Sequence, residues 1–305
     1  MTDKRDIIIL DCDEIVCPLV LLFVFDELCG YFKRNNYNVK IVKKINELHN
    51  NCIVFMGNIF RCLDPAKLLN LYAPDAIYIG WYWHDIDISC LKYFIYTYEN
   101  FLNMLHDESR IDCFKKLTLN DFNTPLLLRA NEDPILIGTY ERIIKYDYCY
   151  MGYNYRPDLV PRSQNNFNGF YHGVYEQSEY LNYETRKNIY LSSTFALGIQ
   201  DIVNIRNKHV SQRIFEGLAY GCIVLSNSYP ACEQTNNIVV YFDSLDDLEN
   251  KMSYYKNNPE LIKQKQEEGY EFIRNFGTNH SSISKFINLI EHKYKIQLVN
   301  NNNIY

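Results

Sequence analysis

Short apolar runs that alternate with helical segments constrain the fold of this chain more than any other feature. In the first half, buried strands are predicted at residues 7–10, 39–41, 52–56 and 76–81, and helices near residues 18–33 and 65–71. Strands that alternate with helices are typical of βαβ units, which build parallel sheets and gather ligands at the carboxyl ends of the strands. The pattern therefore predicts an α/β fold.

A second series of the same kind begins near residue 145. Apolar runs lie at residues 146–151, 170–172, 194–199, 222–226 and 238–242, with helical patterns between them. The best-defined helix is predicted over residues 211–220, with Ser211 as its N-cap and Gly221 as its stop. A chain of 305 residues has room for two domains of common size. We predict Rossmann-like domains at residues 1–145 and 146–280, followed by a C-terminal helix and an Asn-rich tail at 281–305.

Composition and charge argue against several classes of protein. A net charge of −6 provides no basic field for a phosphate backbone, so a nucleic-acid-binding protein is not expected. The ten cysteines form no Cys-x-x-Cys pair, which argues against zinc and redox motifs, and buried free thiols indicate a reducing compartment. The start lacks a signal-peptide core, and the longest apolar run, residues 17–25, is too short to span a bilayer. We expect a cytoplasmic protein without a transmembrane segment.

The strongest local motif runs from Arg213 to Ser226 and reads RIFEGLAYGCIVLS. Backbone amides at a helix N-terminus and a nearby cation can bind a diphosphate. A carboxylate can bind the two hydroxyls of a ribose. Ser211, Arg213 and Glu216 supply these groups within one short helix. The alternative is an ion pair on the helix surface between Arg213 and Glu216, at i and i+3, worth about 0.2–0.5 kcal/mol.

This motif resembles the R-x-F-E-A-L-A-x-G helix and following strand of group 1 glycosyltransferases, especially the type related to spore-maturation proteins. The likeness extends from residue 145 to residue 280 and includes the 147–152 strand followed by Arg156. It implies the GT-B fold, with two Rossmann-like domains facing a cleft. It also implies a nucleotide-sugar co-substrate and no required metal or other cofactor.

The resemblance further implies which residues hold the donor. Glu216 would bind the ribose, and basic and small residues around the helix start would bind the phosphates. The implied donor-binding residues are Gly152, Arg156, Gly173, Ser211, Arg213 and Glu216. The sequence departs from the family at Lys208, where many retaining members carry a second Glu, and this puts a retaining mechanism in doubt. Lys208 could instead face phosphate as a cation or lie in a solvated loop.

Two polar clusters in the first half follow predicted strands. One contains Asp13, and the other contains His84 and Asp85. An acceptor hydroxyl requires a base within hydrogen-bond reach, and a His oriented by a carboxylate is one arrangement that supplies it. We predict His84 as the base, with Asp85 and Asp13 as the other catalytic candidates; the alternative for His84 is a structural role. Trp81 and Trp83 could stack on an acceptor sugar or pack in the core.

The sequence as a whole predicts a metal-independent glycosyltransferase of the hexosyltransferase type. It would move a sugar from a nucleotide-sugar donor to a hydroxyl on a glycan, glycoprotein or other acceptor. Two alternatives remain at this level. One is an exostosin-like or fucosyltransferase-like enzyme, and the other is a catalytically silent protein that binds a carbohydrate or nucleotide sugar on the same fold.

Overall fold

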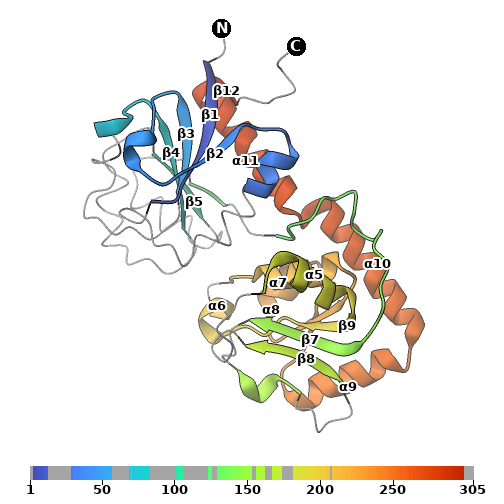
Figure 1. Cartoon of the computed structure of the whole chain (residues 1–305). Helices are drawn as coiled ribbons and strands as arrows, with labels where there is room; N and C mark the ends of the chain where they lie inside the picture. The colour runs from blue at the N-terminus through green and yellow to red at the C-terminus, as the bar shows by residue number, and fades with distance from the viewer. Residues whose placement is uncertain are drawn as a thin grey trace. The chain divides into compact units, whose positions relative to one another are not determined.

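The computed structural model describes the residues in the ranges 3–12, 29–56, 69, 71–82, 101–105, 123–125, 129–152, 156–161, 167–173, 181–206 and 208–298. The chain forms two compact units (Figure 1). The first unit comprises Met1–Leu127 together with Ile283–Tyr305, and the second comprises Leu128–Ser282. Among the described residues, no helix combines the length and apolarity that crossing a membrane requires.

The first unit is built on a seven-stranded parallel sheet. Its path is β12-β1-β3-β4-β5-β6, and β2 also pairs with β1. The strands are β1 (Asp3–Leu10), β2 (Val39–Val42), β3 (Cys52–Met56), β4 (Ile77–Tyr82), β5 (Phe101–Leu105), β6 (Asn123–Pro125) and β12 (Ile296–Leu298). A 3-10 helix, η1 (Ile45–Glu47), lies between β2 and β3. Every residue of β3 is buried, which is typical of a central parallel strand covered on both faces.

The C-terminal segment completes this first unit. Helix α11 (Asn279–Tyr294) places the ring of Phe286 against Phe55 of β3, with centroids 6.5 Å apart. The Ser284 and Tyr31 hydroxyls lie 2.7 Å apart, and β12 then pairs with the start of β1. The predicted helix at the C-terminus is confirmed. Its assignment to a separate segment differs from the structure, because its apolar face and β12 are buried in the N-terminal sheet.

The second unit contains a five-stranded parallel sheet with the order β11-β10-β9-β7-β8. The strands are β7 (Tyr146–Gly152), β8 (Gly169–Gly173), β9 (Ser193–Leu197), β10 (Ile223–Ser226) and β11 (Val240–Tyr241). The helices are η3 (Pro157–Leu159), α5 (Tyr183–Leu191), α6 (Ile202–Arg206), α7 (Gln212–Ala219), α8 (Tyr229–Gln234), α9 (Leu245–Lys256) and α10 (Pro259–Phe276). The α/β prediction is thereby confirmed.

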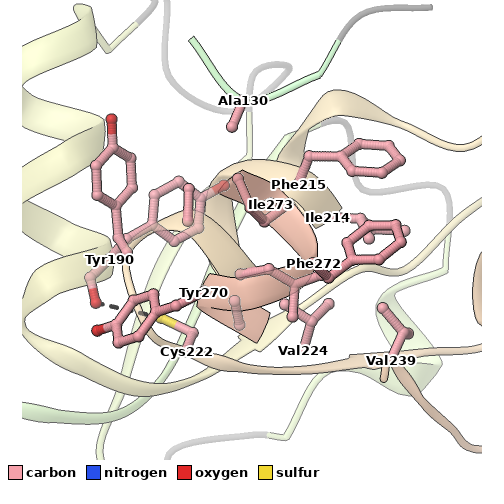
Figure 2. Close-up of a cluster of buried hydrophobic side chains, with 14 of the residues drawn as sticks. Ala130, Tyr190, Ile214, Phe215, Cys222, Val224, Val239, Tyr270, Phe272 and Ile273 are labelled. Carbon is pink, nitrogen blue, oxygen red and sulfur yellow. Dashed lines mark hydrogen bonds between the residues drawn. The ribbon is translucent and has the colours of Figure 1, made fainter. Parts of the chain in front are cut away.

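The sheet of the second unit lies between two apolar clusters. Successive side chains of a strand point to opposite faces, so Tyr148 and Phe195 join one cluster while Cys149 and Ala196 join the other. The cluster that contains Cys149 and Ala196 also contains side chains of α7 and α10, as Figure 2 shows for Ile214 and Ile273. Burial of such side chains contributes about 1.5–3 kcal/mol each. Helices on both faces explain why the strands read as continuous apolar runs.

Residues 129–145 belong to the second unit, although the sequence places the domain boundary near 145. The Ala130 N–H donates to the Gly277 carbonyl at 2.8 Å, and the Asn279 N–H donates to the Ala130 carbonyl at 2.9 Å. Further along, the Lys145 N–H donates to the Ser192 carbonyl at 2.8 Å. This segment carries no regular strand or helix of its own, so its sequence pattern does not show which sheet it covers.

Candidate functional site

The strand order of the second unit defines where a ligand should bind. The chain leaves β7 for β8 on one side and then enters β9 on the other side of β7. The strand order therefore reverses between β7 and β9. In open α/β sheets, ligands bind outside the carboxyl ends of the strands at such a switch point. The residues that follow β7 and β9, and the helix that begins beside them, form the candidate site.

Gly152 ends β7 at this switch point and lies directly against Arg213. A Cβ on residue 152 would approach the Arg213 Cζ to 2.8 Å, so a larger residue would displace the guanidinium. The backbone φ of Gly152 is +151°, a value that L side chains rarely adopt. Gly152 of β7 and Arg213 of α7, which the sequence assigned to donor binding, thus lie next to each other. Glycine is required here both by the backbone and by the arginine.

The guanidinium of Arg213 is held in place but only partly satisfied. Its Nε donates a hydrogen bond to the Ser211 Oγ at 3.1 Å, and its Cζ lies 5.6 Å from the ring centroid of Tyr150. Its Nη1 is buried and has no hydrogen-bond partner within the described part of the chain. A buried, unpartnered cationic nitrogen at a sheet switch point is suited to an anion such as phosphate.

Helix α7 begins beside this guanidinium. Ser211 occupies the predicted N-cap position, but its side chain makes no capping hydrogen bond and instead accepts from Arg213. The N-terminal amides of α7 are therefore not capped by this hydroxyl. The predicted stop is confirmed: Gly221 has φ +79°, and a Cβ there would collide with the Tyr270 hydroxyl.

Glu216 lies on α7 but is paired with a different arginine from the one the sequence suggests. Its side chain is 5% exposed, and its Oε1 accepts a hydrogen bond from the Arg186 Nη2 of α5 at 3.1 Å. The alternative of an ion pair between Arg213 and Glu216 is wrong, because α5 packs against α7 and supplies the partner. The ribose-binding role of Glu216 stays a prediction, and any such role would have to share the carboxylate with Arg186.

The remaining donor candidates lie at the same edge or on the surface. Gly173 ends β8 and is in register with Gly152. Arg156 is exposed, and its Nη2 pairs with Asp158 at 2.7 Å. Lys208 is also exposed, with φ +54°, and its carbonyl accepts from the Gln234 Nε2 at 2.9 Å. Lys208 therefore lies in an exposed turn after α6. Whether it faces phosphate stays a prediction.

The N-terminal candidates fall mostly outside the described residues. Asp13, Trp83, His84 and Asp85 all lie in undescribed ranges, so their catalytic and acceptor roles stay predictions. Trp81 lies in β4, where its backbone pairs in register with Met104 of β5. Among the described residues, no group of three or more His, Cys, Asp or Glu side chains is placed to hold a metal ion.

Two buried polar residues of the second unit were missed by the sequence reasoning. Gln200 follows β9 and is 2% exposed, but the sequence places it just past an apolar strand and marks it with no motif. Glu132, also buried, accepts hydrogen bonds from Lys187 and Tyr140. A polar residue next to an apolar run is the only signal for Gln200. No local pattern indicates Glu132.

Comparisons with known proteins support the fold described above. Residues 148–288, just under half of the chain, match a family model described as glycosyl transferase-like. The chain also resembles the T4 phage BGT solved with UDP and Mn²⁺, with a TM-score of 0.56 and 12% identity over 95% of this chain and 99% of the other. The chain has the GT-B fold.

Two further GT-B structures support the same fold. A DNA-modifying β-glucosyltransferase, studied with and without uridine diphosphoglucose, has a TM-score of 0.55 and 14% identity, over 94% of this chain and all of the other. The TarM protein of S. aureus, in complex with UDP, has a TM-score of 0.50 and 11% identity, over 86% of this chain and 58% of TarM. No curated protein matches the sequence. The more specific resemblance to spore-maturation-type enzymes stays a prediction.

Proposed function

We propose that this protein is a glycosyltransferase that moves a hexose from a UDP-sugar donor to an acceptor hydroxyl. The observation that carries the proposal is the Arg213 guanidinium, which lies against Gly152 with a buried, unpartnered Nη1. This cation lies at the switch point of a glycosyl transferase-like domain on a GT-B fold. UDP is proposed because BGT and TarM were solved with UDP.

The proposed chemistry follows from the charges at this edge. The donor diphosphate would accept hydrogen bonds from Arg213 and from the N-terminal amides of α7, and Glu216 would hold the ribose. In the transfer step, the acceptor oxygen bonds to the anomeric carbon while the bond from that carbon to the phosphate oxygen breaks. UDP leaves with the bond electrons, and the acceptor proton passes to a base, for which His84 is the proposed residue.

The acceptor proposed is a hydroxyl of a glycan, a glycoprotein or another acceptor in the cytoplasm. A net charge of −6 does not favour a nucleic-acid acceptor, although one GT-B neighbour is a DNA-modifying enzyme. A catalytically silent binding protein would give the same donor affinity without turnover. Measuring UDP release from UDP-glucose, with glycan and DNA acceptors in parallel, separates these functions.

Arg213→Met is expected to weaken UDP-glucose binding about 10- to 150-fold, the cost of losing a charged hydrogen bond. The melting temperature of the ligand-free protein should change little, because loss of the hydrogen bond from Nε to Ser211 is offset by removal of a buried nitrogen that has no partner. Isothermal titration calorimetry and thermal unfolding measure the two effects. Lys263→Met, which removes an exposed charge from α10, serves as the control. Parental affinity in Arg213→Met would remove this residue from the donor site.

Turnover is expected to survive chelation. Because the phosphates are proposed to meet Arg213 and the α7 amides, EDTA should lower the rate of UDP release by less than about 2-fold, a change smaller than one lost hydrogen bond. The alternative is a metal-dependent enzyme, since the T4 phage BGT was solved with Mn²⁺ as well as UDP. Complete loss of activity in EDTA that Mn²⁺ restores would contradict metal independence.

A further inference from the structure

The side chain of Gln200 is buried without any hydrogen bond. The residue is 2% exposed, and neither Oε1 nor Nε2 has a partner within the described part of the chain. Native proteins rarely leave a buried amide wholly unsatisfied, since the group has lost its hydration without compensation.

The backbone of Gln200 is held firmly in place. Its N–H donates to the Asn227 Oδ1 at 2.8 Å, and its carbonyl accepts from the Asn227 Nδ2 at 3.0 Å. The Ser226 Oγ also donates to the Gly198 carbonyl at 2.7 Å. These bonds tie the carboxyl ends of β9 and β10 together. The Gln200 amide is therefore anchored at its backbone while its side chain is left unused.

Gln200 lies at the same sheet edge as Arg213. The strands β7 and β9 pair in parallel, with Tyr148 opposite Phe195, so their carboxyl ends lie at one edge of the sheet. Gly152 ends β7, and Gln200 follows the end of β9 by three residues. Helix α7 also begins over this loop, because a Cβ on Gly198 would approach the Ile214 Cγ1 to 2.8 Å. Two unpartnered buried polar groups, one charged and one neutral, thus flank a single switch point.

We propose that the Gln200 side-chain amide recognises the uncharged part of the bound UDP-sugar. This inference rests on the proposed function and extends it from the phosphates to the uracil and the sugar of the donor. A primary amide offers a donor and an acceptor side by side. Its complement is another closely spaced donor and acceptor, as the imide edge of uracil or a pair of sugar hydroxyls provides. Arg213 would hold the charged diphosphate.

The substitution Gln200→Met tests this role because it keeps the length of the side chain and removes both polar atoms. Binding of UDP-glucose should weaken about 10- to 100-fold, the effect of losing two neutral hydrogen bonds. The ligand-free protein should unfold at the same or a higher temperature, since an unsatisfied buried amide is replaced by an apolar group. Gln264→Met, on the exposed surface of α10, should leave both quantities unchanged.

Comparing UDP with UDP-glucose identifies which part of the donor is recognised. Equal weakening for both ligands assigns the amide to the uracil, and weakening for UDP-glucose alone assigns it to the sugar hydroxyls. Parental affinity of Gln200→Met for both ligands overturns the inference and leaves the proposed function intact, and so does a loss of stability in the ligand-free variant. A parental chain that binds neither UDP nor UDP-glucose overturns both.

Discussion

Replacing Glu132 with alanine is expected to lower the free energy of unfolding by about 3–5 kcal/mol, the usual cost of removing one partner of a buried ion pair. The Glu132 and Lys187 side chains are only 10% and 13% exposed, and their oxygen and nitrogen lie 3.0 Å apart. Removal of the carboxylate leaves the Lys187 ammonium buried without its anion. Chemical denaturation followed by circular dichroism measures the difference.

The surroundings of Glu132 explain why the effect should be large. Its Oε2 also accepts hydrogen bonds from the Tyr140, Tyr183 and Tyr220 hydroxyls at 2.9, 3.2 and 3.2 Å. The Lys187 ammonium lies 3.8 Å from the ring centroid of Tyr140. The network links the 129–145 segment to α5 and to the end of α7. Because α5 carries Arg186, the partner of Glu216, loss of this network should also loosen the candidate site.

The contribution of Glu132 should depend on pH. Burial raises the pKa of this carboxyl, but the Asp133 N–H, Lys187 and Tyr140 outweigh burial and hold the pKa below its ordinary value of 4.5. A carboxyl with a lowered pKa stabilises the folded state above the pKa of the unfolded chain. That stability is lost as the pH falls through the folded pKa. The gap between the parent and Glu132→Gln should therefore be full at neutral pH and narrow below about pH 4.

A matched control lies on α10, where Glu268 forms a partly exposed pair with Lys265 at 2.8 Å. Exposed pairs are screened by solvent, so Glu268→Ala should cost less than about 1 kcal/mol. If Glu132→Ala is no more destabilising than Glu268→Ala, the buried network does not stabilise the second unit.

Replacing His84 with alanine is expected to lower turnover about 10²- to 10⁴-fold, the range for lost general-base catalysis. The affinity for UDP-glucose should stay nearly unchanged, because the donor is proposed to bind at the Arg213 edge of the second unit. Steady-state UDP release and calorimetry on the same variant separate the two effects. This prediction rests on the sequence alone, since His84 lies outside the described residues.

Two companion variants decide which group is the base. Asp13→Asn and Asp85→Asn remove the other carboxylates that follow predicted strands in the first half. Inactive Asp13→Asn beside a nearly parental His84→Ala would make Asp13 the base. Full activity of all three variants would show that the N-terminal catalytic assignment is wrong.

The sequence by itself determined the elements whose signals are local. Apolar runs at 52–56 and 146–151 became β3 and β7, because parallel strands covered on both faces are mostly apolar. Gly221 ended α7 as predicted, since only glycine readily takes the positive φ found there. The Arg213 motif likewise indicated a donor site, and the structure places its arginine against Gly152. Strands β5 and β6 were not predicted: Asn103 interrupts the apolar residues of β5, and β6 is a three-residue strand without a large apolar side chain.

Only the tertiary structure decided which groups meet. Glu216 lies three residues from Arg213 in the sequence, yet its partner is Arg186 of α5. Packing of α5 against α7 brings the side chains of Arg186 and Glu216 into contact. The same holds for Glu132 and Lys187, and for β12, which returns to the first sheet. The unsatisfied amide of Gln200 is a property of its surroundings, since burial and missing partners depend on every segment packed around a residue. No local pattern records them.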